Sequence, residues 1–238
     1  MKFYFGGYYL IKPRKADFGS IKNKKFLTCS SCINDTLIDS WAISWATPIE
    51  HQIKELREEF GISEAKQIEI QNWADMKLEE NRIGWHQVFS DLETIKEYSD
   101  KYFSHIKEKE ILQILFPEDE REDFLTEFAP TKKEYGTLGI YDNLQKKIVE
   151  KESNVEEFVG FDLIGVELGG DFHTFHCHDI ANQLGNKFGI ELNEYGLIKE
   201  IANHKEIVDY MNDDENGFEP VPWYLVKVKK EKKPAGNK

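Results

Sequence analysis

The chain has 238 residues, of which 40% are hydrophobic and 32% are charged, and its formal net charge at pH 7 is −13. This composition excludes an intrinsically disordered chain and is sufficient for one large hydrophobic core. No apolar run reaches the ~18 uncharged residues of a membrane-spanning helix. Residues 1–15 lack a secretion signal, and three cysteines are too few for a disulfide framework. We therefore expect a cytoplasmic protein.

The charge is unevenly distributed along the chain. Residues 1–25 contain seven lysines and arginines against Asp17, and residues 226–238 contain six lysines against Glu231. The chain between these two segments is therefore more acidic than the total suggests. Such a body repels a nucleic-acid backbone and attracts a basic protein partner. An excess of carboxylates can also serve solubility alone.

Apolar periodicity and turn residues predict the elements of the first half. The expected strands are 2–11, with a bulge at Gly6-Gly7, then 24–29, 39–46, 85–89 and 111–116. The expected helices are 48–60, 63–80, one that begins with Ser90 and Glu93 as a capping box, and an acidic one over 117–128.

The second half is predicted in the same way. The expected strands are 158–168 and 171–178, joined by a turn at Gly169-Gly170, and 223–230, with a lysine-rich edge or exit. The expected helices follow Asp179 and Asn193 and cover 204–211, before a loop over 212–222. Because strands and helices alternate without a βαβ rhythm, we expect an α+β fold with a mainly antiparallel or mixed sheet. We expect one domain over 1–238, with 129–158 as the candidate lobe boundary.

The sharpest chemical signal is the histidine-rich run from His173 to His178. On a strand, His176 and His178 would face the same side, about 6.5–7 Å apart. Two imidazoles at that spacing can share a zinc ion, which could activate water if a third ligand is present. The candidates for this third ligand are His51, His86 and Asp179. On the same strand His173 would face the other side, and the alternative is that all these histidines are ordinary strand residues.

A second signal is the pair Cys29 and Cys32 in a C-x-x-C arrangement. Such a pair can be half of a zinc site or a redox pair. A zinc site would need further ligands, such as Cys177 with His176 or His178. The alternative is two unligated thiols in a turn.

The acidic helix predicted over 117–128 is a candidate binding surface. Its carboxylates create a strong local negative field, and Arg121 is the only basic residue in this segment. The residues that we expect to contact a basic partner are Glu118, Asp119, Glu120, Glu122 and Asp123. An exposed helix face without any partner would have the same composition.

The C-terminal third carries a set of motifs that can be compared with a known class of proteins. These motifs are Phe172-His173-Thr174, Cys177, Asn193-x-x-Gly196-Leu197-Ile198 and Glu219-Pro220-Val221. The stretches 160–198 and 217–228 resemble segments of small bacterial cytosolic immunity proteins that accompany polymorphic toxins. The resemblance implies an acidic protein without cofactor or catalytic residues that neutralises a basic toxin domain by binding it.

Two functions therefore remain open from the sequence. The first is an immunity protein that binds a basic toxin domain stoichiometrically and needs no cofactor. The second is a metal-dependent hydrolase with a zinc site at His176 and His178. The acidic charge and the resemblance favour the binding protein over the enzyme.

Overall fold

The computed structural model describes most of the chain. The described residues are 1–18, 21–30, 33–36, 58, 60–84, 88–135, 139–167, 172–177 and 180–232. Several predictions fall outside these ranges, namely the strand 39–46, nearly all of the helix 48–60 and the turn at Gly169-Gly170. The same holds for Cys32, His51, His86, His178 and Asp179.

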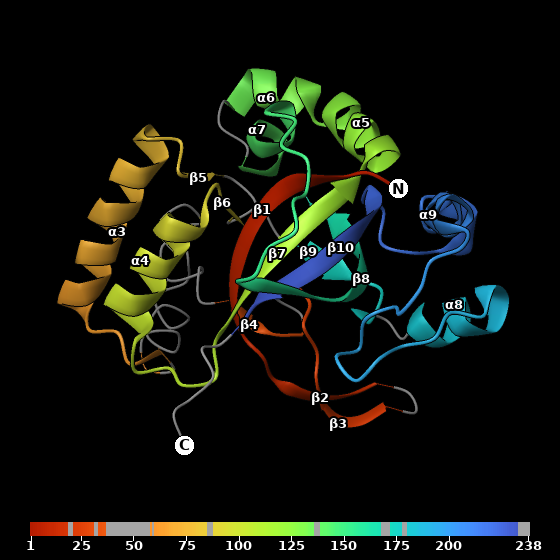
Figure 1. The fold of residues 1–238 in the computed structure, drawn as a ribbon, viewed down its shortest axis with the longest axis horizontal. Coiled ribbons are helices and arrows are strands. Elements are labelled where there is room, and N and C mark those ends of the chain that lie inside the picture. Colours follow the sequence, from red (N-terminus) through yellow and green to blue (C-terminus); the bar gives the residue numbers. More distant parts are fainter. Residues whose placement is uncertain are drawn as a thin grey trace.

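One antiparallel sheet forms the centre of the molecule (Figure 1). Its strands are β1 (Phe3–Lys12), β4 (Asp35–Thr36), β5 (Ile83–Gly84), β6 (Val88–Phe89), β7 (Glu110–Pro117), β8 (Glu156–Val166), β9 (Phe172–Thr174) and β10 (Trp223–Glu231). Their order is β5-β6-β1-β7-β10-β8-β9, with β4 paired to β1. A separate hairpin is formed by β2 (Lys15–Phe18) and β3 (Ile21–Lys25). The predicted α+β class with a mainly antiparallel sheet is confirmed.

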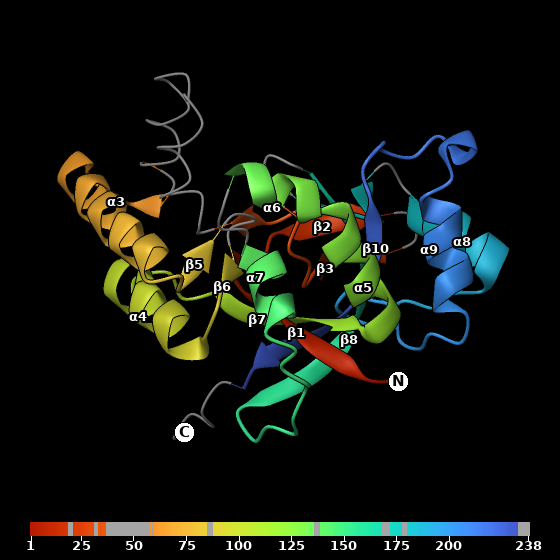
Figure 2. The ribbon, with the colours of Figure 1, turned by 90° about the horizontal axis from the view of Figure 1, so that it is seen from above.

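Helices cover the sheet from several sides. They are α3 (Glu64–Glu79), α4 (Leu92–Phe103), α5 (Glu118–Glu127), α6 (Ala129–Tyr135), α7 (Gly139–Gln145), α8 (Ile180–Phe188) and α9 (His204–Met211). Figures 1 and 2 show α3 and α4 at one side of the sheet and α8 and α9 at the opposite side. None of these helices is long and apolar enough to cross a membrane.

Among the described residues, the core consists of two clusters of buried side chains on the two faces of β10. Tyr224, Val226 and Val228 belong to the larger cluster, which includes residues of β1, β7, α4 and α5. Trp223 and Leu225 belong to the smaller cluster, which they share with residues of α8 and α9. Alternate side chains of a strand point to opposite faces, so β10 is buried on both sides.

Most predicted elements are confirmed, including the bulge in β1, where the register with β7 shifts between Phe5 and Gly7. Ser63 caps α3 as expected, since its hydroxyl oxygen accepts a hydrogen bond from the Lys66 amide at 3.2 Å. At the start of α4 the prediction is one residue off. The N-cap is Asp91, which accepts from the Thr94 amide at 2.8 Å, because a carboxylate caps as well as the hydroxyl of Ser90 does.

The lysines of β10 mark the exit of the strand and not a sheet edge, because β10 lies between β7 and β8. Three predictions are wrong. The strand expected over 24–29 ends at Lys25. Asn193 starts no helix, because its side-chain oxygen accepts from the amides of Tyr195 and Leu197 in a turn. The strand expected over 171–178 ends at Thr174, and a turn and a 3₁₀ residue follow.

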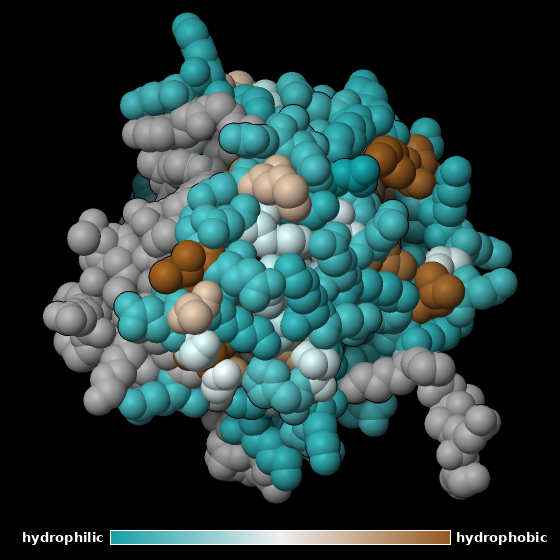
Figure 3. Space-filling view, turned by 90° about the vertical axis from the view of Figure 1, so that its left-hand side faces the viewer, coloured by the Kyte–Doolittle hydropathy of each residue, from teal (hydrophilic) through white to brown (hydrophobic). Residues whose placement is uncertain are grey.

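Figure 3 shows the side of the molecule where α3 and α4 lie in Figure 1. Among the described residues this face is mostly hydrophilic, with hydrophobic residues in separate spots rather than in one patch. Ile68 and Met76 of α3 are among the large hydrophobic residues that are exposed. Isolated exposed apolar side chains such as these are normal on a protein surface and need no explanation.

Gly196 and Gly189 allow a matched test of core packing. Both have a positive φ, +70° at Gly196 and +65° at Gly189. A Cβ at Gly196 would lie 1.8 Å from Cδ1 of Phe26, whereas a Cβ at Gly189 would meet nothing within 4 Å. Gly189→Ala should therefore lose about 1 kcal/mol of unfolding free energy from backbone strain alone. Gly196→Ala should lose a further ~1–3 kcal/mol because Phe26 must move. Urea denaturation measures both, and equal losses would contradict the packing at Phe26.

Candidate functional site

An acidic cleft of about 390 Å³ lies where α5, α9 and the loop before β10 meet. Seven carboxylate side chains line it: Glu120, Asp123 and Glu127 of α5, Asp209 of α9, and Asp213, Asp214 and Glu219 of the segment between α9 and β10. Apolar side chains form other parts of the wall, among them Met211, Phe218 and Val221. The cleft therefore combines a strong negative charge with an apolar surface.

The sequence of α5 explains how this helix contributes to the cleft. Phe124 is fully buried and stacks on Phe128 with ring centroids 4.5 Å apart, and it also contacts Tyr224 of β10. These contacts fix the rotation of the helix about its axis. Glu120, Asp123 and Glu127 are spaced i, i+3 and i+7 and therefore lie on one face of the helix. That face lines the cleft.

The loop wall of the cleft is held by Asn212 and Trp223. The Asn212 side chain donates to the Trp223 carbonyl at 2.9 Å and accepts from the Trp223 amide at 2.7 Å. This pair closes the segment 213–222 at its base. The indole Nε1 of Trp223 also donates to the Glu219 carbonyl at 3.2 Å. The acidic loop is therefore fixed to the start of the central strand β10.

Glu120 is the unusual residue of the cleft because it is only 3% exposed. Its Oε2 atom is buried and has no hydrogen-bond partner among the described residues. Burial and the nearby charge of Asp119 raise the pKa of Glu120 to about 8, although a backbone hydrogen bond from Leu225 acts in the opposite direction. Glu120 therefore carries a proton at neutral pH, and its buried Oε2 becomes available to a cation at the cleft when this proton leaves.

The charges around Glu120 come from two elements. Asp119 and Asp123 on α5 raise its pKa, and Lys205 on α9 lowers it. Lys205 is also paired with Asp209 at 2.9 Å. Burial raises the pKa of Tyr224 strongly, and the carboxylates of α5 raise it further. The potential in the cleft therefore disfavours any further negative charge.

Of the five residues predicted to bind a partner, two line the cleft and three do not. Glu120 and Asp123 line the cleft. Glu118 accepts a hydrogen bond from the Tyr4 hydroxyl at 2.8 Å, and Asp119 lies 2.8 Å from Nε2 of His204. Glu122 is paired with Arg121. Only part of the predicted surface therefore faces the cleft.

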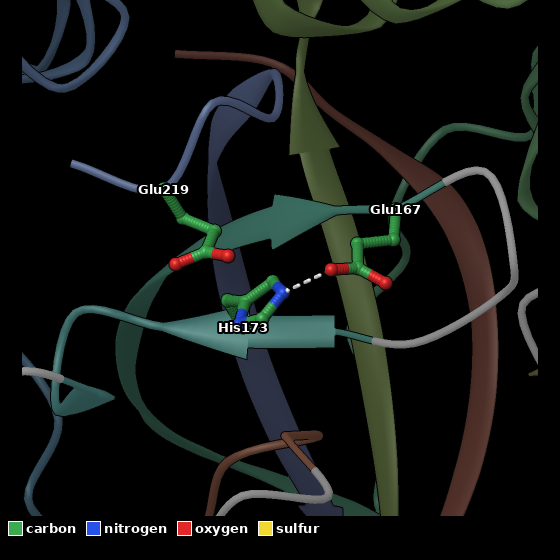
Figure 4. A group of neighbouring side chains, drawn as sticks. All are labelled: Glu167, His173 and Glu219. Atoms are coloured by element: carbon green, nitrogen blue, oxygen red, sulfur yellow. Dashed lines mark hydrogen bonds and ion pairs between the residues drawn. The ribbon is translucent and has the colours of Figure 1, made fainter.

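A second group of ionisable side chains adjoins the cleft. Figure 4 shows Glu167, His173 and Glu219 converging from three segments of the chain. Nε2 of His173 lies 2.8 Å from Oε1 of Glu167, and one ligand atom of each of the three residues lies within 4.8 Å of the others. All three side chains are partly buried. Within the described ranges, this is the only such group of three His, Cys, Asp or Glu residues that could hold a metal ion.

The local sequence explains this convergence. His173 is opposite Gly165 in the β8–β9 pair, and Trp223 is opposite Gly165 on β10. A Cβ on Gly165 would lie 2.8 Å from Cγ2 of Val221. Glycine at this position therefore lets the loop that carries Glu219 lie against β8. The Val166 amide donates to the Pro222 carbonyl at 3.0 Å and fixes the loop there.

His176 lies in the core rather than on a strand face. Its side chain is fully buried and packs against Phe26 and Phe175, and its Nε2 contacts the Gly196 carbonyl. Burial lowers the pKa of His176 to about 4, so the imidazole is neutral. His178 lies outside the described residues. The predicted zinc pair therefore gains no support from His176.

Cys29 and Cys177, the two cysteines among the described residues, adjoin a buried polar network. Asp162 accepts hydrogen bonds from the hydroxyls of Thr28 and Thr174, and burial raises its pKa to about 7. Burial, with a further contribution from Asp162, raises the pKa of the Cys29 thiol. Cys177 is also buried, 3.7 Å from the Ser30 hydroxyl. A buried thiol of raised pKa is a poor nucleophile, which favours a packing role for Cys29.

Sequence reasoning did not find His173, Glu167, Glu219 or the acidic residues opposite α5. The Glu219-Pro220-Val221 motif was noted only for its resemblance, and the signal for His173 was misread because β9 was extended beyond Thr174.

Comparison with known proteins adds no assignment. No family model, curated protein or solved structure matches the chain.

The raised pKa of Glu120 predicts a pH dependence of stability. A carboxyl group whose pKa is higher in the folded state than its usual 4.5 destabilises the fold as the pH rises from 4.5 to 8. Glu120→Gln removes this titration and keeps the shape of the side chain. The variant should gain on the order of 2 kcal/mol of unfolding free energy over wild type between pH 5 and pH 8. Urea denaturation across this range measures the difference, and a constant difference would show that Glu120 titrates normally.

Proposed function

We propose that this is a cytoplasmic, cofactor-independent binding protein that captures a basic protein partner at the acidic cleft, as an immunity protein captures a toxin domain. The observation that carries the proposal is the convergence of seven acidic side chains, of which Glu120 is protonated at neutral pH, from α5, α9 and the loop before β10 on one cleft. A cluster of like charges costs folding free energy through self-repulsion. A basic partner relieves that repulsion on binding.

The shape of the cleft suits a lysine or arginine side chain. These side chains have an apolar stem and a charged end. Met211, Phe218 and Val221 can pack against the stem. The carboxylates can bind the charged end, and Glu120 supplies a further buried acceptor when it ionises. Charge-assisted hydrogen bonds of this kind are shorter and stronger than those between neutral groups.

The immunity function itself rests on the sequence resemblance. The resembling stretch 217–228 includes part of the loop wall of the cleft, and Glu219 lines it. An immunity protein acts by binding, so it needs no catalytic group. The acidic surface also accelerates encounter with an oppositely charged partner. These properties agree with one another in a stoichiometric inhibitor of a basic toxin domain.

A neutralising variant of the cleft tests the proposal. We choose Asp123→Asn/Asp213→Asn/Asp214→Asn, which removes three carboxylates that line the cleft. As bait in a lysate of the source cells, wild type should retain a basic protein in a one-to-one complex. The triple variant should bind that protein at least ~10-fold more weakly, because each lost charge pair contributes roughly 0.5–1 kcal/mol. Calorimetry with the purified partner measures the difference.

The matched control has the same net charge as this variant. Glu64→Gln/Glu79→Gln/Glu93→Gln removes three exposed carboxylates of α3 and α4, which Figure 1 shows on the side opposite α9. The control should bind the partner as wild type does. Equal weakening by both triple variants would mean that total charge rather than the cleft attracts the partner. A retained partner that is acidic would also contradict the proposal.

Salt provides a kinetic test of the same interface. Raising the ionic strength from 0.05 to 0.5 M shortens the Debye length from about 14 to about 4 Å. The association rate constant should fall by roughly 10-fold or more, whereas the dissociation rate constant should change much less. Stopped-flow mixing with the purified partner measures both. An association rate constant that does not depend on salt would contradict electrostatic steering.

A further inference from the structure

We propose that Glu167, His173 and Glu219 form a binding site for a divalent transition-metal ion, with Zn²⁺ as the representative. The three residues come from the end of β8, from β9 and from the loop before β10 (Figure 4). One imidazole nitrogen and two carboxylate oxygens lie within 4.8 Å of one another. The site differs from the zinc pair predicted at His176 and His178 and goes beyond the proposed capture of a basic partner.

The distances between the donor atoms are close to those of a metal site. Zinc binds imidazole nitrogen and carboxylate oxygen at about 2.0–2.2 Å, so its ligand atoms are roughly 3–4 Å apart. His173 and Glu167 are already closer than this, at 2.8 Å. The side chain of Glu167 is partly exposed and can adjust by rotation about its bonds. A metal can therefore replace the direct contact with only small shifts of side chains.

The donor types favour a transition metal over calcium or magnesium. Imidazole suits zinc, copper, iron and nickel, whereas Ca²⁺ and Mg²⁺ prefer sites made of oxygen alone. Two carboxylates and a neutral imidazole also balance the charge of a divalent ion. The second carboxylate therefore distinguishes this group from a simple histidine–carboxylate ion pair.

The backbone holds the three residues in place. His173 is fixed by the antiparallel pairing of Phe172–Thr174 with β8, and Glu167 directly follows the last residue of β8. The Glu219 carbonyl accepts from the Val221 amide at 2.8 Å and from the Trp223 indole. Rigid support of this kind lowers the entropy cost of binding an ion. A hollow of about 520 Å³ borders Glu167 and Glu219 and has room for water as a further ligand.

His204 and Asp119 provide a matched comparison within the same molecule. Their atoms Nε2 and Oδ2 are also 2.8 Å apart, and the side chain of His204 is 15% exposed, against 14% for His173. No third ligand atom within the described ranges completes a metal group there. The two histidines therefore differ in the second carboxylate and hardly at all in exposure or in the length of the ion pair.

The experiment is a titration of the full-length, chelator-treated protein with zinc chloride, followed by calorimetry. Wild type should bind one ion at this site, and zinc should raise its melting temperature, as a ligand of the folded state does. His173→Ala and, separately, Glu219→Gln should each weaken this binding by more than about 100-fold, beyond the effect of losing an outer-shell partner. His204→Ala should bind zinc as wild type does.

Cobalt(II) provides a second readout, because its visible absorption reports nitrogen and oxygen ligation directly. Wild type and His204→Ala should give the same cobalt spectrum, and His173→Ala should not. The proposal is overturned if wild type binds no zinc, or if zinc binding is equal in wild type, His173→Ala and Glu219→Gln. Glu219→Gln preserves the shape of a partly buried loop side chain, so it remains informative if His173→Ala does not fold. The titration involves no protein partner, so its failure would leave the proposed capture of a basic protein untouched.

Discussion

The pairing of β10 with both β7 and β8 is the interaction on which both proposed sites depend. It places a strand from the end of the chain in the middle of the sheet, where nine of its residues are paired with β8. The segment before β10 must therefore cross from α9 back to the sheet. Asn212 bonds both backbone groups of Trp223, and Gly165 leaves space for Val221, so this segment lies against β8. As a result the acidic loop faces α5 on one side and His173 on the other.

The same pairing separates the opposite charges of the chain. At its C-terminal end β10 carries lysines that are paired with carboxylates, since Lys227 binds Glu150 at 2.7 Å and Lys230 lies 3.1 Å from Glu157. At its N-terminal end the carboxylates of α5 and of the acidic loop are gathered around one cleft. Because β10 is hydrogen-bonded to its neighbours along its length, its two ends stay apart. The cleft lies at one end of the strand, and the lysines lie toward the other.

The sequence predicted the features that depend on neighbouring residues. The bulge in β1, the cap at Ser63 and the acidic helix α5 each follow from a local pattern, and the structure contains all three. It did not predict which strands become neighbours, because pairing is decided by contacts between distant segments. Without the position of β10, nothing in the sequence brings Glu219 close to His173. The prediction that side chains alternate between the two faces of one strand also failed from residue 175 onward. β9 has only three residues, so the alternation ends at Thr174.

Glu120 and Glu219 show how the charge of the cleft can be adjusted. Because its pKa is about 8, Glu120 is neutral at pH 7 and adds little to the repulsion among the other carboxylates, which water screens. A cation that reaches its buried oxygen would favour the ionised form and gain a charge-assisted bond where the dielectric is low. A metal ion at Glu219 would act in the opposite direction, since it would neutralise one of the carboxylates that line the cleft. Occupation of the metal site should therefore weaken the attraction of the cleft for a basic partner.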